Sequence, residues 1–134
     1  MAGGIGMITI PGRAVPKERM TTKQMRCAKG GVQGKKFDRI RSCLNYQEYI
    51  AWSIVGLKKY SGLLRMTARI YLSPNKKGEL PGVRGDLDNY IKSIKDGLQY
   101  GNLFDNDKQI IRYGEGTGIY TDTNERVEIE IWEE

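Results

Sequence analysis

Two aspartates and a lysine in the second half of the chain, Asp86, Asp88 and Lys92, have side chains and spacing that suit metal-assisted chemistry. In the extended chain that enters a helix, residues i and i+2 project to the same side. The positive end of a helix dipole then favours the ionised form of both carboxylates. Lys92 follows Asp88 by four residues, about 40° round a helix, so the three charged groups are expected on nearly the same face.

Carboxylates this close repel each other unless a cation neutralises them. Mg²⁺ suits such an all-oxygen site, because it binds one or two carboxylates and completes its shell with water and phosphate oxygens. A bound ion would lower the pKa of water and stabilise charge on a phosphodiester under attack, while Lys92 would hold a phosphate or leaving oxygen. The same residues also suit a structural role, in which Asp88 caps the helix and Lys92 is its i, i+4 partner.

A second acidic pair, Asp105 and Asp107, follows this helix after a short return of the chain. A helix of roughly four turns with such a return can bring the pair back towards the sheet. The sequence leaves open whether Asp105 or Asp107 then reaches Asp86 and Asp88.

The chain contains no histidine and only two cysteines, Cys27 and Cys43. Without histidine, Ser-His-Asp and Cys-His nucleophiles are excluded, as is a four-ligand Cys/His zinc site within one chain. We expect both cysteines to be reduced thiols. Any chemistry must therefore depend on carboxylates, lysines, hydroxyls or a bound ion.

The net charge is +6, and it is unevenly distributed. The segment between Arg13 and Arg41 has a local net charge of +8, whereas the last thirteen residues are mainly acidic. Such a segment favours a polyanionic partner, because each neutralised phosphate releases a counterion; a solvated flexible loop is the alternative. Its basic residues are Arg13, Lys17, Arg19, Lys23, Arg26, Lys29, Lys35, Lys36, Arg39 and Arg41.

Apolar periodicity predicts two helices and four strands. Alternation indicates a strand over residues 64–72, and apolar residues at helical spacing indicate helices over about 43–60 and from Asp88 to about 100. Tyr46, Ile50, Ile54 and Leu57 form the stripe of the first helix. The remaining strands are predicted over 5–10, from about 109, and over about 126–132.

The resulting order, β-α-β-α-β-β, predicts an α+β or mixed α/β fold, with a small sheet of about four strands and two main helices. We expect one domain over 1–134, with a mobile basic loop at about 13–41. No segment approaches the roughly 20 apolar residues of a membrane span, and the N-terminus lacks the pattern of a signal peptide. The expectation is a cytoplasmic protein without a membrane partner.

Three short motifs in the second half of the chain resemble the signature of the RusA Holliday-junction resolvases. That signature reads D-x-D-N-x-x-K, then D-[AG]-L, then D-D-x-Q-[VI], and the chain matches it over 86–92, 96–98 and 107–110. Residues 8–12 and 16–19 also resemble the first strand of the family and the Pro/Lys/Arg loop after it. The likeness is strong over about 25 residues from Asp86 and looser elsewhere.

The resemblance implies metal ligands at Asp86, Asp88 and Asp107, with Lys92 as the catalytic lysine. It implies Mg²⁺, for which Mn²⁺ can substitute, and no organic cofactor. The chain departs from the signature at Asn106, where the family usually has an aspartate. Asp105 either compensates for this difference or is a surface residue of the turn, which leaves a second metal position open. At Asp96, another family position, a structural hydrogen bond is favoured over a ligand role.

Family behaviour also implies branched DNA as the partner and a homodimer, because two symmetric nicks at a four-way junction suit two sites related by a two-fold axis. Phe37 is the preferred candidate for stacking on an unpaired base, ahead of Tyr46, Tyr49 and Trp52, and for Tyr46 a place in the core stripe is favoured. Arg65 and Arg69 would add phosphate contacts, or else form a solvated sheet face. The predicted DNA-binding residues are Arg13, Lys17, Arg19, Lys23, Arg26, Lys29, Lys35, Lys36, Phe37, Arg65 and Arg69.

Two other functions remain compatible with the residues. One is a non-catalytic nucleic-acid-binding module, in which the acids are only caps and turn residues. The other is a metal-dependent hydrolase of small phosphate esters, which would not need the basic segment. The hypothesis carried forward is a structure-selective endodeoxyribonuclease that resolves four-way DNA junctions in recombination and repair.

Overall fold

The computed structural model describes residues 4–78 and 81–134, so part of the N-terminal segment in which no signal peptide was expected lies outside it. Within these residues the predicted α+β class is confirmed, with three helices and a mixed sheet of five strands. The elements are β1 (Gly4–Pro11), α1 (Thr22–Lys29), α2 (Lys35–Ser53), β2 (Leu64–Leu72), α3 (Leu87–Tyr100), the 3-10 turn η1 (Asp107–Gln109), β3 (Ile110–Tyr113), β4 (Gly118–Thr121) and β5 (Arg126–Glu133).

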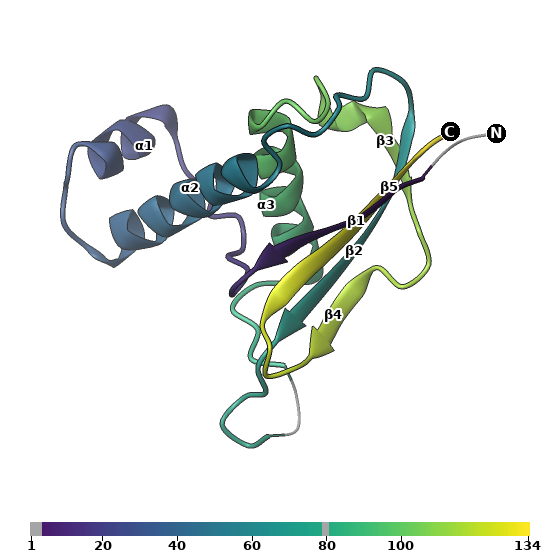
Figure 1. Cartoon of the computed structure of the whole chain (residues 1–134). Helices are drawn as coiled ribbons and strands as arrows, with labels where there is room; N and C mark the ends of the chain where they lie inside the picture. The colour runs from purple at the N-terminus through teal and green to yellow at the C-terminus, as the bar shows by residue number, and fades with distance from the viewer. Residues whose placement is uncertain (1–3, 79–80) are drawn as a thin grey trace.

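The sheet has the strand order β1-β5-β2-β3, and β4 also pairs with β2. Strands β1 and β2 both run antiparallel to β5, whereas β3 and β4 run parallel to β2. Strand β3 pairs with the first residues of β2 and β4 with the last, so together they form one interrupted edge (Figure 1).

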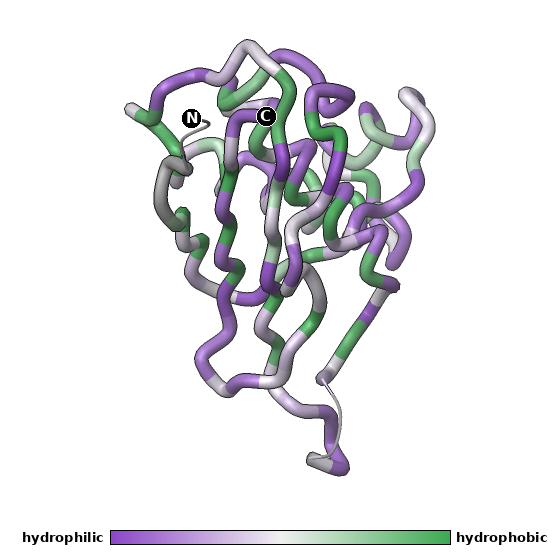
Figure 2. Tube along the Cα trace, turned by 90° about the vertical axis from the view of Figure 1, so that its right-hand side faces the viewer, coloured by the Kyte–Doolittle hydropathy of each residue, from purple (hydrophilic) through white to green (hydrophobic). Residues whose placement is uncertain are grey.

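One face of the sheet packs against α2 and α3 (Figure 1). The alternation of apolar residues along β2 determines which face packs against the helices, since every second residue from Leu64 to Leu72 is fully buried. Figure 2 shows hydrophilic and hydrophobic residues alternating along the strands. Tyr46 and Ile50 of α2 and Ile94 of α3 complete the core against this face. None of the helices in the described part of the chain is long and apolar enough to cross a bilayer.

Two glycines allow α3 to approach α2 closely. A Cβ atom added at Gly97 would lie 2.8 Å from Ile50 Cβ, and one added at Gly101 would lie 2.9 Å from the backbone Cα of Ala51. Real Cβ atoms essentially never come this close. The close crossing of α2 and α3, which places α3 over the sheet, therefore depends on the absence of a side chain at Gly97 and Gly101.

We expect Gly101→Ala to destabilise the protein by about 1–3 kcal/mol, the usual cost of overpacking a core. Gly101 has a φ of −81°, which alanine also adopts, so the cost comes from packing rather than from backbone strain. Urea unfolding measures the change. Gly62→Ala is the control, because its added Cβ meets nothing within 4 Å, and its stability should match or slightly exceed that of the wild type.

The basic segment 13–41 is not the continuous loop that we predicted, because it contains α1 and the start of α2. Helix α1 begins with a capping box, in which the side chain of Thr21 accepts from Gln24 N and that of Gln24 accepts from Thr21 N. Arg41 on α2 then donates to the carbonyls of Ala28 and Val32, which ties α1 to α2.

Three other boundaries differ from prediction. Helix α2 begins at Lys35 rather than about residue 43 and ends at Ser53, so Leu57 is 47% exposed and lies outside the core stripe. Gly56 has a φ of 90°, which favours the early stop. The single strand predicted from about residue 109 is two short strands, β3 and β4, because the chain turns between Gly114 and Thr117. The sheet therefore has five strands instead of about four.

Candidate active site

The two aspartates at the start of α3 have different local roles. Asp86 is the N-cap, and its Oδ1 accepts from Asn89 N at 2.8 Å. Asp88 therefore lies in the first turn, so the alternative in which Asp88 caps the helix is wrong. Both carboxylates are exposed, and Asp88 has no hydrogen-bond or ion-pair partner among the described residues.

The chain after α3 folds back so that Asp107 meets Lys92. The Nζ atom of Lys92 donates to Asp107 Oδ2 at 3.0 Å and lies 3.2 Å from Asp96 Oδ1. The hydrogen bond from Lys92 lowers the pKa of the Asp107 carboxyl, and that same bond raises the pKa of the Lys92 ammonium. Both groups are therefore charged at neutral pH, with an ammonium between two carboxylates.

Two glutamines that the sequence reasoning missed hold Asp107 in place. The side chain of Gln99 on α3 accepts from Asp107 N at 3.2 Å. Gln109 Nε2 donates to the carbonyls of Tyr60 and Gly62, which fixes the turn to the segment before β2. Gln109 is the glutamine of the third motif, so its position in that motif was the available signal.

The residue that departs from the family signature, Asn106, has a structural role here. Its side chain accepts from Lys108 N at 2.9 Å and caps η1. Asp105 forms an ion pair with Lys59 and is largely exposed. Asp105 therefore has an ion-pair partner away from Lys92, in keeping with the surface-turn alternative.

Lys17 connects the basic segment to the cluster of Lys92, Asp96 and Asp107. Its backbone N–H donates to Asn89 O at 2.9 Å, and its Nζ lies 3.0 Å from Asp96 Oδ2. Asp96 thus bridges two lysines, Lys17 and Lys92, in agreement with the structural bonding expected for it. A Cβ added at Gly85 would lie 2.9 Å from Pro16, so the segment before Lys17 packs tightly against the entrance to α3.

The chemistry of these residues fits a divalent cation, because Asp86, Asp88 and Asp107 supply only hard carboxylate oxygens. Within residues 4–78 and 81–134, no three His, Cys, Asp or Glu side chains form a group that could hold a metal ion. The structure brings Asp107 to Lys92 and keeps Asp86 and Asp88 together at the helix start. The three-aspartate ligand set stays a prediction.

The predicted DNA-binding residues fall into two groups. Arg13 pairs with Glu125, Lys17 with Asp96, and Lys36 with Glu18 at 2.7 Å. Five further cations predicted to bind DNA are exposed and form no ion pair within the part of the chain that the structure describes: Arg19, Lys23, Arg26, Lys29 and Lys35. Phe37, near the start of α2, is half-buried.

Arg65 and Arg69 lie on the sheet face opposite the helices, but they are half-buried rather than fully exposed. Arg69 donates to Glu130 at 2.9 Å, and the Arg65 guanidinium lies 4.6 Å from the ring centroid of Trp132. These contacts belong to a mixed layer of arginines, acids and aromatic rings along β2 and β5. Their DNA-binding role stays a prediction.

The acids at the start of α3 and the lysine paired to the returning aspartate are groups that suit metal-assisted attack on a phosphodiester. The family model described as endodeoxyribonuclease RusA matches residues 11–132, which is most of the chain. The chain therefore belongs to the RusA endodeoxyribonuclease family and is a Holliday junction resolvase. None of the curated proteins with which the sequence was compared matches it.

Proposed function

We propose that the chain resolves four-way DNA junctions as a homodimer, with Mg²⁺ held by Asp86, Asp88 and Asp107 and with Lys92 as the catalytic lysine. Mn²⁺ can replace Mg²⁺ in the same oxygen site. The proposed setting is the cytoplasm, in DNA recombination and repair. The observation that carries the proposal is the contact between Lys92 and Asp107, which links the first and third motifs across fifteen residues of chain.

Each side chain has a distinct proposed task. The ion, when bound, supplies an activated water and neutralises charge on the phosphodiester. Asp88 offers the carboxylate that has no partner within the described residues, and Asp86 adds the Oδ2 atom that its capping bond does not use. Lys92 holds the scissile phosphate or the leaving oxygen through its ammonium group.

The DNA-binding surface is proposed to follow the basic segment. Its exposed cations would contact the phosphates of the junction arms: Arg19, Lys23, Arg26, Lys29 and Lys35. Arg13, Lys17 and Lys36 would contribute mainly by shaping this surface, because each already pairs with an acid. Phe37 is the proposed stacking residue at the crossover.

The test is a nicking assay in Mg²⁺ on a labelled four-way junction, beside a linear duplex of the same sequence. We expect paired, symmetric nicks on the junction and none on the duplex. Omission of the metal, with EDTA present, should abolish nicking while junction binding persists. Tight binding without nicks in Mg²⁺ or Mn²⁺ would contradict the proposed chemistry and favour a non-catalytic binding role for this chain.

A further inference from the structure

The guanidinium of Arg13, a residue predicted to bind DNA, is already engaged on two sides within the protein. Its Nη1 atom donates to Glu125 Oε2, and its Nη2 atom donates to the carbonyl of Gly82. Because the donors of a guanidinium form a rigid fork, two acceptors fix its orientation. Arg13 therefore connects the chain after β1 to the turn before β5 and to the segment that leads into α3.

The carboxylate of Glu125 also holds the chain that leaves β2. Its Oε2 atom accepts from Ser73 N at 3.0 Å, and Ser73 O accepts in turn from Gly82 N at 2.8 Å. The hydrogen bond from Ser73 keeps the pKa of the Glu125 carboxyl below its usual value, and the charge of Arg13 acts in the same direction. Arg13, Glu125, Ser73 and Gly82 thus form a closed ring of contacts, which we call the Arg13–Glu125 clamp.

The clamp lies just ahead of the aspartates at the start of α3. Gly82 precedes Asp86 by four residues, and between them Arg84 N donates to the hydroxyl of Tyr90, a buried residue of α3, at 3.0 Å. The segment 82–86 is therefore fixed by the clamp at one end and by α3 at the other. Asp86 and Asp88 are themselves exposed, so the backbone that carries them has to set where their carboxylates lie.

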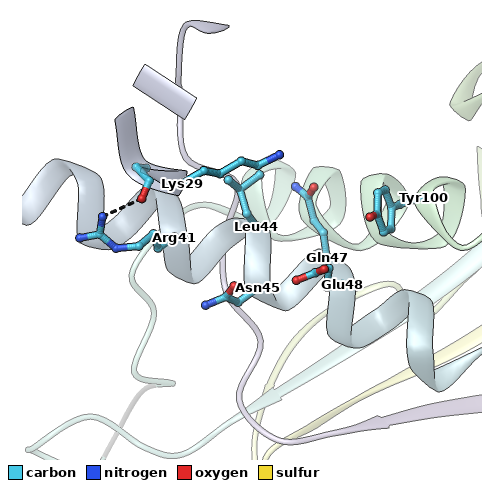
Figure 3. Close-up of a pocket in the computed structure, with 8 residues that line it drawn as sticks. Lys29, Arg41, Leu44, Asn45, Gln47, Glu48 and Tyr100 are labelled. Carbon is cyan, nitrogen blue, oxygen red and sulfur yellow. Dashed lines mark hydrogen bonds between the residues drawn. The ribbon is translucent and has the colours of Figure 1, made fainter. Parts of the chain in front are cut away.

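The chain that follows Arg13 is anchored beside the same segment. Lys17 N donates to Asn89 O at 2.9 Å, which holds residues 13–17 along the entrance to α3. Further along, α1 is tied to α2 by Arg41, which donates to the carbonyl of Ala28 at 2.9 Å (Figure 3). Arg13 is thus the first of several contacts that fix the basic segment relative to the sheet, and it is the one that reaches the sheet itself.

We propose that Arg13 and Glu125 are positioning residues for junction cleavage, which act through the backbone that carries Asp86 and Asp88. The inference rests on the metal-binding role proposed for these two aspartates. Without the clamp, the segment 82–86 would lose its fastening to the sheet, and the carboxylates would shift. A misplacement of about 1 Å far from the chemistry can cost about a hundredfold in rate.

The opposite charges of the two residues separate positioning from attraction to DNA. Arg13→Met and Glu125→Met should each slow single-turnover cleavage at saturating protein by about 10–100-fold. Junction affinity in EDTA and its dependence on salt should change little, because neither side chain contacts a phosphate. If Arg13→Met weakens binding and lowers the salt slope by about one, while Glu125→Met tightens binding, Arg13 is a DNA contact and the inference is wrong.

Arg112→Met is the matched control for the loss of one cation. Arg112 lies on β3, and its Nε atom is 2.9 Å from Glu134 Oε1, so this variant also removes a charge and an ion pair. It should cleave at close to the wild-type rate. Thermal unfolding checks the fold of every variant. Glu125→Gln is the milder alternative, because it keeps an acceptor for Ser73 N, and it should lose less rate than Glu125→Met.

Two further variants test the clamp as a unit. The double variant of Arg13→Met and Glu125→Met should cleave no more slowly than the slower single variant, because either change opens the same ring. Losses that multiply would show that the two residues act separately, against the inference. Arg13→Lys should recover part of the rate, because it keeps the charge without the fork. Full recovery would make charge, rather than the forked contact, the property that matters.

Hydrogen exchange in the metal-free protein gives a readout that does not depend on cleavage. The amide of Gly82, which donates to Ser73, should exchange about tenfold faster in Arg13→Met than in the wild type. Slower cleavage with unchanged exchange at Gly82 would overturn the inference. A wild type that makes no nicks would overturn the proposed chemistry instead, and exchange at Gly82 would still decide whether the clamp holds this segment.

Discussion

Asp88→Asn is expected to abolish junction cleavage and to leave junction binding intact or tighter. Asparagine keeps the shape of the side chain and removes the negative charge that a divalent cation needs. Loss of a residue that only supports a metal ligand typically lowers metal affinity or activity by about 10–100-fold. Loss of a ligand itself should therefore slow cleavage by at least about a hundredfold. Binding should persist, because removing an acid beside the phosphate raises the local positive potential.

Single-turnover cleavage in Mg²⁺ and a binding measurement in EDTA separate the two effects. Thermal unfolding gives a third readout, because Mg²⁺ should stabilise the wild type and stabilise Asp88→Asn less. Asp105→Asn is the matched control, since Asp105 is an exposed aspartate that pairs with Lys59, and it should cleave at close to the wild-type rate. Binding that is lost together with cleavage would instead make Asp88 a DNA-recognition residue.

The elements that position Asp88 could be predicted because each buries one face. Strand β2 was placed at its observed bounds, since every second residue from Leu64 to Leu72 is buried. Helix α3 was also found, because Ile91, Ile94 and Leu98 return at helical spacing and are buried against the sheet. Local apolar periodicity is sufficient for such elements.

Helix α1 could not be found in this way, because its one fully buried residue is Ala28. A different signal was present, since Thr21 and Gln24 have the spacing of a capping box. What holds α1 in place is tertiary, namely the bonds from Arg41 to carbonyls at its end. Periodicity carries no information about such contacts.

The sequence predicted which residues belong to the candidate site, but it did not predict how those residues are arranged in space. The return of Asp107 to Lys92 depends on Gln109, which reaches carbonyls of Tyr60 and Gly62 almost fifty residues earlier in the chain. Likewise, nothing in the local pattern shows that Lys17 joins Asp96. Long-range polar contacts of this kind depend on how the turns pack, and a single sequence does not contain that information in any local window.

Lys92→Met should lower the cleavage rate by about 10²–10³-fold, the range found when one group that stabilises transition-state charge is removed. Junction affinity should change much less, because this ammonium acts at the reacting phosphate. Methionine has a similar length and leaves the buried stripe of α3 intact, and thermal unfolding verifies the fold. Lys92→Arg should recover part of the rate, since guanidinium keeps the charge but with a different geometry.

Asp96→Asn tests whether Asp96 acts through Lys92. The Oδ1 atom of Asp96 lies 3.2 Å from Lys92 Nζ. Asp96 would therefore keep this lysine in place when a metal ion competes with it for Asp107. The single variant should slow cleavage by about 10–100-fold, whereas in the Lys92→Met background it should add little, because the group that it positions is gone. Equal losses in both backgrounds would show that Asp96 works independently, through Lys17 or through the stability of α3.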